Sequence, residues 1–321
     1  MKTSRIIFKK TSIYLITMLV FMLGMGSHPV HANFSAKHAC TNSAKAAYRA
    51  CGHDIKDDFW IHYGNCVNTR RPFQALSCIS EAFDTYKEDR ELCRDQRVAR
   101  KEICQLLGDG PYMPKIKPAN FLGAEEIAAN PNPYFPLTPG LVKVFESGDE
   151  TITVTVTDQT KEILGIECIV VRDTVEENGE LVEDTYDWYA QDVFGNVWYF
   201  GELSMNYEDG ELTDLDGSWQ SGVDGAQPGL IMKASPAEGE VYRQEYLLGE
   251  AEDMAQVYST FDQGESAPAA DCSTGCLVIR EFLPIEPDVE EFKYYVSGLG
   301  FILASKPDSD EREELVEITL P

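Results

Sequence analysis

The sequence has few of the residues that common enzyme chemistries require. Its 321 residues include five histidines, and none follows His62. A serine or cysteine nucleophile in the C-terminal two-thirds would therefore need its base from the N-terminal segment. The chain also has no C-x-x-C pair and no glycine-rich phosphate loop ahead of a helix. No catalytic motif stands out, and we expect a protein that binds rather than one that catalyses.

Basic residues are scarce as well. The chain has 27 Lys and Arg against 54 Asp and Glu, a net charge of −27. The imbalance is concentrated in one part: residues 33–120 carry 14 basic and 11 acidic residues, and residues 121–321 carry 9 and 43. A segment this acidic repels nucleic acid and anionic membrane surfaces, so neither is an expected partner.

Long apolar runs are absent after the N-terminus. Residues 1–32 have the pattern of a secretory signal peptide, with basic residues up to Lys10, an apolar run over Ile13–Met25 and a small-residue cleavage site at Val30-His31-Ala32. We therefore expect an exported protein, periplasmic or extracellular, without a membrane span in the mature chain.

The nine cysteines include six in residues 33–110, a segment that we expect to be a helical hairpin. Their successive separations are 11, 15, 12, 15 and 11 residues, which read the same in both directions. Eleven residues are about three helical turns, so each outer pair shares one helix face. Two antiparallel helices, expected over Ser35–Ala50 and Gln74–Leu107, would then be joined by nested disulfides. The predicted pairs are Cys40–Cys104, Cys51–Cys93 and Cys66–Cys78.

This paired spacing resembles the twin-cysteine helical hairpins of the coiled-coil-helix type, which usually have one residue fewer between their cysteines. The alternative is a metal site, since His38, His53 and His62 all lie near cysteines. An even number of cysteines in an exported chain favours disulfides.

Residues 111–140 are rich in proline and predict an extended linker. From residue 141 the apolar period changes to two, and turn residues recur at short intervals. We expect ten to twelve antiparallel strands over residues 141–321, forming a meander, curved or barrel-like sheet. The predicted fold class is therefore α+β: a disulfide-stapled helical hairpin followed by an acidic antiparallel β domain.

One expected β-hairpin, residues 183–202, is unusually aromatic. Its two strands are apolar on both faces, so either protein covers both faces or one face lines a ligand groove. The candidate ligand-binding residues are Tyr186, Trp188, Tyr189, Trp198 and Phe200.

Parts of the β segment resemble a group of exported bacterial β-domain proteins of no established activity. The resemblance rests on Asn132–Gly140, Asp184–Glu202, Gly222–Gly229, and Lys293–Tyr295 with Gly298–Gly300, and it covers roughly residues 130–320. It implies a β-sheet fold and no mechanism.

Oxygen-rich loops favour calcium, and carboxylates crowd residues 206–217. The candidate ligands are Glu208, Asp209, Asp214 and Asp216, although their spacing is not that of an EF-hand and ordinary hairpin turns would also explain them. No other cofactor is expected.

Three cysteines lie in the β segment. Cys272 and Cys276 can close a small loop, which leaves Cys168 as a buried thiol in an apolar strand; pairing of Cys168 with Cys272 or Cys276 is the alternative.

The sequence thus predicts an exported binding or cell-surface interaction protein, with a small molecule, glycan or protein as its ligand. Two alternatives remain: an exported, glycosidase-like hydrolase that uses paired carboxylates, and a calcium-stabilised structural or adhesion module.

Overall fold

The computed structural model describes residues 36–69, 71–307 and 309–321, so the predicted signal peptide lies outside the described residues. Residues Ser35–Pro321 form one compact unit. Among the described residues, no helix is both long and apolar enough to cross a membrane. The helices are η1 (Ala36–His38), α1 (Ala39–Val67), α2 (Pro72–Leu107), η2 (Pro118–Asn120) and α3 (Ala124–Ala129).

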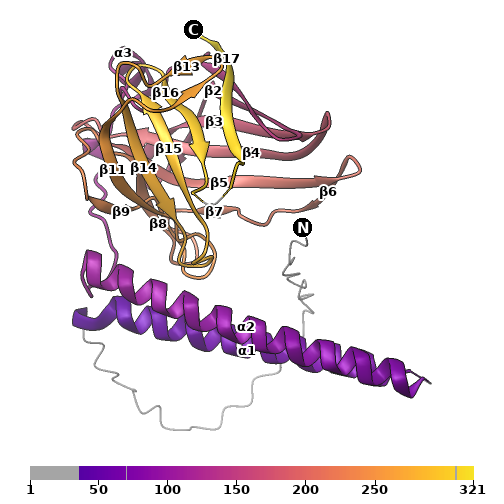
Figure 1. Cartoon of the computed structure of the whole chain (residues 1–321). Coiled ribbons are helices and arrows are strands. Elements are labelled where there is room, and N and C mark those ends of the chain that lie inside the picture. Colours follow the sequence, from indigo (N-terminus) through magenta and orange to yellow (C-terminus); the bar gives the residue numbers. More distant parts are fainter. Residues whose placement is uncertain (1–35, 70, 308) are drawn as a thin grey trace, which may run out of the picture. The chain divides into compact units, whose positions relative to one another are not determined.

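The two long helices form the predicted disulfide-linked hairpin, and Figure 1 shows α1 and α2 side by side. Helix α1 continues to Val67, well beyond the predicted end at Ala50. Gly52 and Gly64 lower the stability of this helix, but the cost of one glycine is too small to end it. Helix α2 begins with Pro72, whose fixed φ suits the first helical position, and ends before Gly108, whose φ is 95°. All three predicted disulfides are confirmed: Cys40–Cys104, Cys51–Cys93 and Cys66–Cys78, with Cα–Cα distances of 5.6, 5.9 and 5.5 Å.

Asp109 ties the two ends of the hairpin together. Its carboxylate accepts a hydrogen bond from the backbone N–H of Thr41 at 2.7 Å and lies 2.7 Å from Nδ1 of His38. These hydrogen bonds lower the pKa of Asp109 to about 2. A carboxylate at the start of a helix also interacts favourably with the helix dipole.

The β segment forms one large antiparallel sheet and a small second one, which confirms the predicted fold class. The described residues contain seventeen strands rather than ten to twelve. Five of these strands have only two or three residues, which is too short for a period of two to be recognised in the sequence. The strands are β1 (Val142–Ser147), β2 (Glu150–Ile163), β3 (Ile166–Glu177), β4 (Glu180–Gln191), β5 (Val197–Glu208), β6 (Glu211–Asp214), β7 (Trp219–Gln220), β8 (Gln227–Met232), β9 (Val241–Arg243), β10 (Glu245–Tyr246), β11 (Met254–Asp262), β12 (Ser266–Ala267), β13 (Ala270–Asp271), β14 (Cys276–Phe282), β15 (Glu290–Val296), β16 (Gly300–Ser305) and β17 (Arg312–Thr319).

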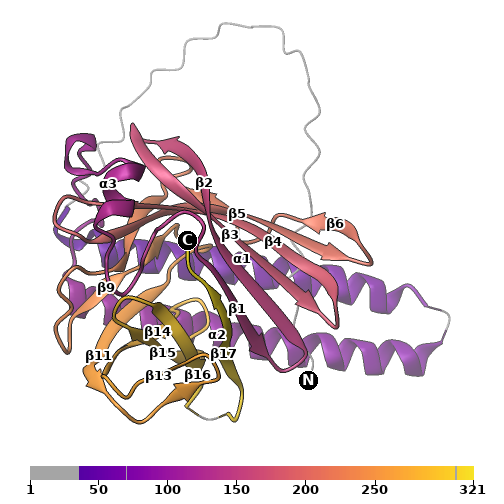
Figure 2. The ribbon, with the colours of Figure 1, turned by 90° about the horizontal axis from the view of Figure 1, so that it is seen from above.

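The large sheet is barrel-like and nearly closed, in the order β10-β8-β5-β4-β3-β2-β1-β17-β16-β15-β14-β11-β9. Figure 2 shows the strands curving around an axis rather than lying in a plane. Its two end strands, β9 and β10, are separated in sequence by Gln244 alone. The chain changes neighbours at Gln244: it pairs with β11 before this residue and with β8 after it.

The closing contact between β8 and the β9–β10 segment requires a glycine. A Cβ atom on Gly229 would lie 2.1 Å from the carbonyl oxygen of Gln244, closer than any side chain allows. Gly201 has a similar role inside β5, where φ is 128° and a Cβ would lie 2.3 Å from the carbonyl oxygen of Trp219. Both glycines let backbones approach where the sheet changes pairing.

Two faces of this sheet carry different cores. The inner face carries the largest buried cluster, to which nearly every part of the sheet contributes, including Val171, Tyr189, Tyr199, Ile279 and Tyr295. The linker closes over this cluster with Ile127 and Leu137, and Leu141, the residue after the linker, packs beside them. On the outer face, one cluster lies over β3–β5. A further cluster, which includes Phe145, Ile302 and Leu315, packs against the β12–β13 loop.

Candidate functional site

The aromatic hairpin of residues 183–202 becomes β4 and β5, and its side chains divide between the two faces. Trp188 and Phe200 are buried on the outer face, with 6% and 0% of their surface exposed. Linker residues Ile116 and Phe121 pack over them, and the Phe121 ring lies 5.7 Å from that of Phe200. The outer face is therefore covered by the linker rather than open as a groove.

The remaining aromatic candidates are also packed. Tyr189 lies on the inner face, stacked on Tyr199 with ring centroids 4.6 Å apart. Tyr186 and Trp198 are partly buried against the outer cluster, and Nε1 of Trp198 donates to Asp192 at 3.0 Å. The structure thus places the five predicted ligand-binding residues on two faces, and it does not bring them together around one space. Their role in ligand binding stays a prediction.

Replacing Phe121 tests whether the linker stabilises the outer face of β4 and β5. We expect Phe121→Leu to lower the free energy of unfolding by about 1 kcal/mol, because the smaller side chain loses ring contacts with Trp198 and Phe200. Phe194 is 72% exposed in the β4–β5 turn, so Phe194→Leu is the matched control with an expected change within about 0.5 kcal/mol. Urea denaturation of both variants measures the difference, and equal curves would show that the linker does not support this face.

The inner face carries an acidic layer that the sequence did not single out. Val171 pairs with Asp187, and Ile279 pairs with Lys293, so these polar residues share the face of the inner cluster. Burial, reinforced by neighbouring carboxylates, raises the pKa of Asp253 to about 7 and that of Glu313 to about 7. The layer comprises Asp173, Asp187, Glu202, Glu245, Asp253, Glu281, Glu291, Lys293 and Glu313.

Asp187 and Glu202 share one hydroxyl group. The hydroxyl oxygen of Tyr199 lies 2.5 Å from Asp187 and 2.9 Å from Glu202. A hydroxyl has a single proton, so it donates to one carboxylate, and the other carboxyl group makes a hydrogen bond only when it is protonated. Burial raises the pKa of Asp187 to about 7 and that of Glu202 to about 8, which is consistent with one proton retained near neutral pH.

Lys293 is the cation of this layer. Its ammonium group lies 2.7 Å from Glu281 and 3.0 Å from Glu291, with 27% of the side chain still exposed. Burial opposes its charge, but the two carboxylates outweigh burial and hold the pKa of Lys293 well above its ordinary value. One ammonium group among eight carboxyl groups leaves the layer strongly acidic.

A buried ion pair joins the helical hairpin to the sheet. Arg100 of α2 donates three hydrogen bonds of 2.7 to 3.0 Å to Glu252, in the turn before β11. Their side chains are only 7% and 2% exposed. The backbone N–H of Gly249 donates to the same carboxylate at 2.8 Å. This bidentate geometry satisfies both charges and fixes α2 against the sheet.

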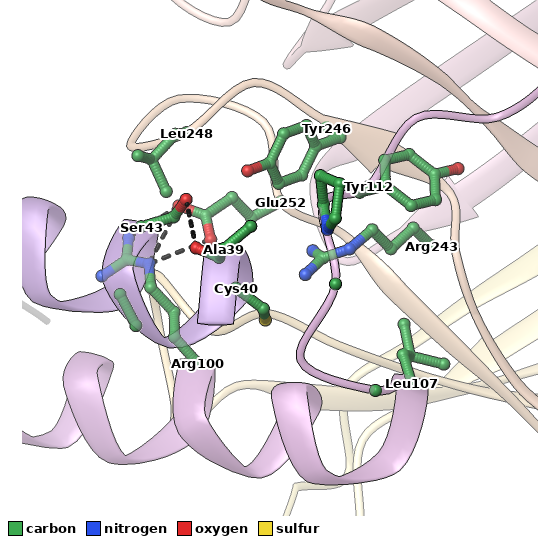
Figure 3. Close-up of a pocket in the computed structure, with 14 residues that line it drawn as sticks. Ala39, Cys40, Ser43, Arg100, Leu107, Tyr112, Arg243, Tyr246, Leu248 and Glu252 are labelled. Carbon is green, nitrogen blue, oxygen red and sulfur yellow. Dashed lines mark hydrogen bonds and ion pairs between the residues drawn. The ribbon is translucent and has the colours of Figure 1, made fainter. Parts of the chain in front are cut away.

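A pocket lies beside this ion pair, where the hairpin meets the sheet (Figure 3). Its volume is about 180 Å³. The first turns of α1, the chain after α2 and the segment from β9 to Glu252 form its walls. We call this space the junction pocket; its lining includes Ser43, Leu107, Tyr112, Arg243, Tyr246, Leu248 and Glu252.

Arg243 is the charged residue of the junction pocket that lacks an ion pair among the described residues. It is 8% exposed, and Figure 3 shows its guanidinium group pointing into the pocket. The rings of Tyr246 and Tyr112 flank it at 4.8 and 5.4 Å. No short motif marks Arg243 or Glu252, which is why the sequence did not reveal this site.

The predicted calcium ligands occupy the exposed β5–β6 hairpin and the turn that follows. Asp214 accepts hydrogen bonds from Asn206 and from the backbone of Asp216, and Asp209 occupies a turn at φ 53°. In the described part of the chain, three or more ligand atoms converge only at His62–Cys66–Cys78 and at Cys40–Cys104–Asp109. The cysteines of both groups are in disulfides, so neither offers a thiolate. Calcium binding stays a prediction.

The cysteines of the sheet are arranged as first expected. Cys272 and Cys276 form a disulfide with an S–S distance of 2.03 Å. Cys168 is a free thiol with no exposed surface, and burial raises its pKa to about 12. A thiol with such a high pKa is a poor nucleophile at neutral pH, so Cys168 is a packing residue.

The comparisons with known proteins return no relative. No family model matches the chain, no curated protein matches it, and no solved structure matches its fold.

Proposed function

We propose that this protein is a non-enzymatic binding protein that captures a small molecule in the junction pocket. The main support is that the disulfide-linked hairpin and the barrel-like sheet meet around this pocket and are held together there by the buried Arg100–Glu252 pair. A site whose walls are held rigidly loses little conformational entropy when a ligand enters. The four disulfides indicate an oxidising compartment outside the cytoplasm, as the predicted export requires.

The lining of the junction pocket favours binding over hydrolysis. Among its fourteen residues, Glu252 is the only carboxylate, whereas a glycosidase-type reaction needs two. Cys40 is in a disulfide, and the hydroxyl of Ser43 donates to the carbonyl oxygen of Ala39 at 3.0 Å. The acidic pair Asp187 and Glu202 lies elsewhere, on the inner face, and Asp187 is only 8% exposed. The hydrolase alternative thus gains no support from this pocket.

A fragment screen tests the proposal. With leucine methyl groups labelled for NMR, we expect bound fragments to shift the resonances of Leu107 and Leu248, which line the pocket. Leu248→Trp should abolish the shift of the Leu107 resonance, because the larger side chain fills the space. Leu212→Trp is the matched control, since Leu212 is 53% exposed on β6, away from the pocket. If no fragment moves the pocket resonances, or if Leu248→Trp leaves the shift of the Leu107 resonance unchanged, the proposal fails.

A further inference from the structure

Arg243 has an incomplete set of partners. Its guanidinium group carries five N–H donors, yet the hydrogen-bond acceptor that the described residues provide is the sulfur of Met254 at 3.7 Å. A thioether sulfur is a weak acceptor and carries no charge. The flanking rings of Tyr112 and Tyr246 stabilise a cation through their π faces without filling its N–H positions. The guanidinium edge that faces the pocket is therefore available to a ligand.

The nearest carboxylate does not neutralise Arg243. Glu252 is bound to Arg100 through three hydrogen bonds, and it attracts Arg243 only from beyond ion-pair distance. Burial lowers the pKa of Arg243, and the positive charge of Arg100 lowers it further. In a chain with twice as many acidic as basic residues, a buried arginine without a carboxylate is exceptional. An incoming anion would replace the missing partner.

The walls of the junction pocket limit the size and character of that anion. Leu107, Pro111 and Leu248 provide apolar contacts. A volume of 180 Å³ is well below the roughly 300–1,000 Å³ of a pocket that binds a drug-sized ligand. The first turns of α1 also border the pocket, and the N-terminal end of a 29-residue helix carries positive potential. Asp109 already accepts the N–H of Thr41, so the donors for a ligand come from Arg243.

We propose that the junction pocket binds a small organic carboxylate with a compact apolar or aromatic group, held by Arg243 through its carboxylate. This inference rests on the proposed binding function and names the ligand class of that same pocket. The planar guanidinium group matches a carboxylate with two parallel hydrogen bonds, and the leucines and tyrosines enclose the apolar part. Inorganic phosphate shares the charge but lacks the apolar part, so it should bind more weakly.

Four probes of related size test the ligand class on the full mature chain: benzoate, benzamide, benzylamine and inorganic phosphate. We expect benzoate to shift the pocket methyl resonances at the lowest concentration, and benzylamine to have no effect because Arg243 and Arg100 repel it. Arg243→Gln should weaken benzoate binding at least about tenfold, because a hydrogen bond to a charged group is lost. Arg243→Lys, which keeps the charge but loses the planar fork, should weaken it by a smaller factor. Arg172→Gln is the control with the same charge change on a partly exposed residue of β3.

The outcomes separate the two proposals. If benzamide and benzylamine bind as tightly as benzoate, the carboxylate assignment fails while the pocket remains a binding site; if none of the four probes binds, both fail. Phosphate binding as tightly as benzoate would overturn the requirement for an apolar group. A thermal melt shows whether Arg243→Gln is folded. If Arg243→Gln is unfolded, the Arg243→Lys variant provides the test instead. If Arg243→Lys binds benzoate as tightly as the unsubstituted protein does, Arg243 does not hold the carboxylate.

Discussion

Raising the pH from about 4.5 to 8 is expected to lower the stability of this protein. Asp187 and Glu202 have pKa values raised by burial to about 7 and about 8, so the folded state retains protons that the unfolded chain releases near its ordinary values of 3.8 and 4.5. Because the folded state binds more protons in this window, the free energy of unfolding decreases as pH rises through it. Asp253 and Glu313 act in the same direction. The summed loss should reach a few kcal/mol, since one pKa unit corresponds to about 1.4 kcal/mol and the carboxyl groups compete for protons.

Urea denaturation at several pH values measures this loss, and neutral substitutions locate its origin. Asp187→Asn and Glu202→Gln replace a titrating carboxyl group by an amide of the same shape, so each should flatten the pH dependence and narrow the difference between pH 5 and pH 8. Glu211→Gln, on the exposed strand β6, is the matched control and should leave the slope unchanged. Stability that stays constant from pH 5 to pH 8 in the unsubstituted protein would contradict the protonated acidic layer.

Breaking the buried ion pair should cost more than any surface substitution. We expect Arg100→Met to lower the free energy of unfolding by about 3–5 kcal/mol, because Glu252 would remain buried as an unpaired charge. The same change should loosen the hairpin from the sheet and expose the chain after Gly108 to proteases. Urea denaturation and limited proteolysis measure the two effects.

A double variant distinguishes the contribution of the ion pair from the cost of leaving one charge buried without its partner. Arg100→Met combined with Glu252→Leu removes both charges and should recover much of the lost stability, since well-packed apolar residues often replace a buried pair without loss. Arg172→Met breaks a partly exposed pair with Asp184 and should cost no more than about 1 kcal/mol. A loss below 1 kcal/mol for Arg100→Met would show that the ion pair does not hold the hairpin in place.

Local patterns were sufficient for the parts of the fold in which neighbours in sequence are neighbours in space. The palindromic cysteine spacing predicted the three hairpin disulfides, because helical periodicity alone sets which cysteines share a face. The antiparallel strands expected after residue 141, such as β14, β15 and β17, form for the same reason, since the period of two is a local property. The short strands on either side of Gln244 carry no such period, and they form only because the sheet closes there.

The residues of the acidic layer and of the junction pocket escaped prediction because their surroundings depend on how the sheet closes. Alternation along a strand shows that its two faces differ, but it does not show which face lies inside a closed sheet. The sequence therefore suggests that carboxylates such as Asp187 and Glu202 belong to a solvated acidic surface. The closed sheet instead places them in the protein interior, where both lie next to the hydroxyl group of Tyr199.

The sequence by itself determined the fold class, the disulfide framework and the acidic character of this protein, since each follows from local spacing or from composition. Only the tertiary structure decided that the linker covers the aromatic hairpin and that Arg100 meets Glu252 across 152 residues. It also decided that Arg243 faces a pocket and has no ion-pair partner among the residues that the structure describes. Contacts at such sequence separation arise when distant segments pack together, and no local pattern encodes which of many charged residues will meet.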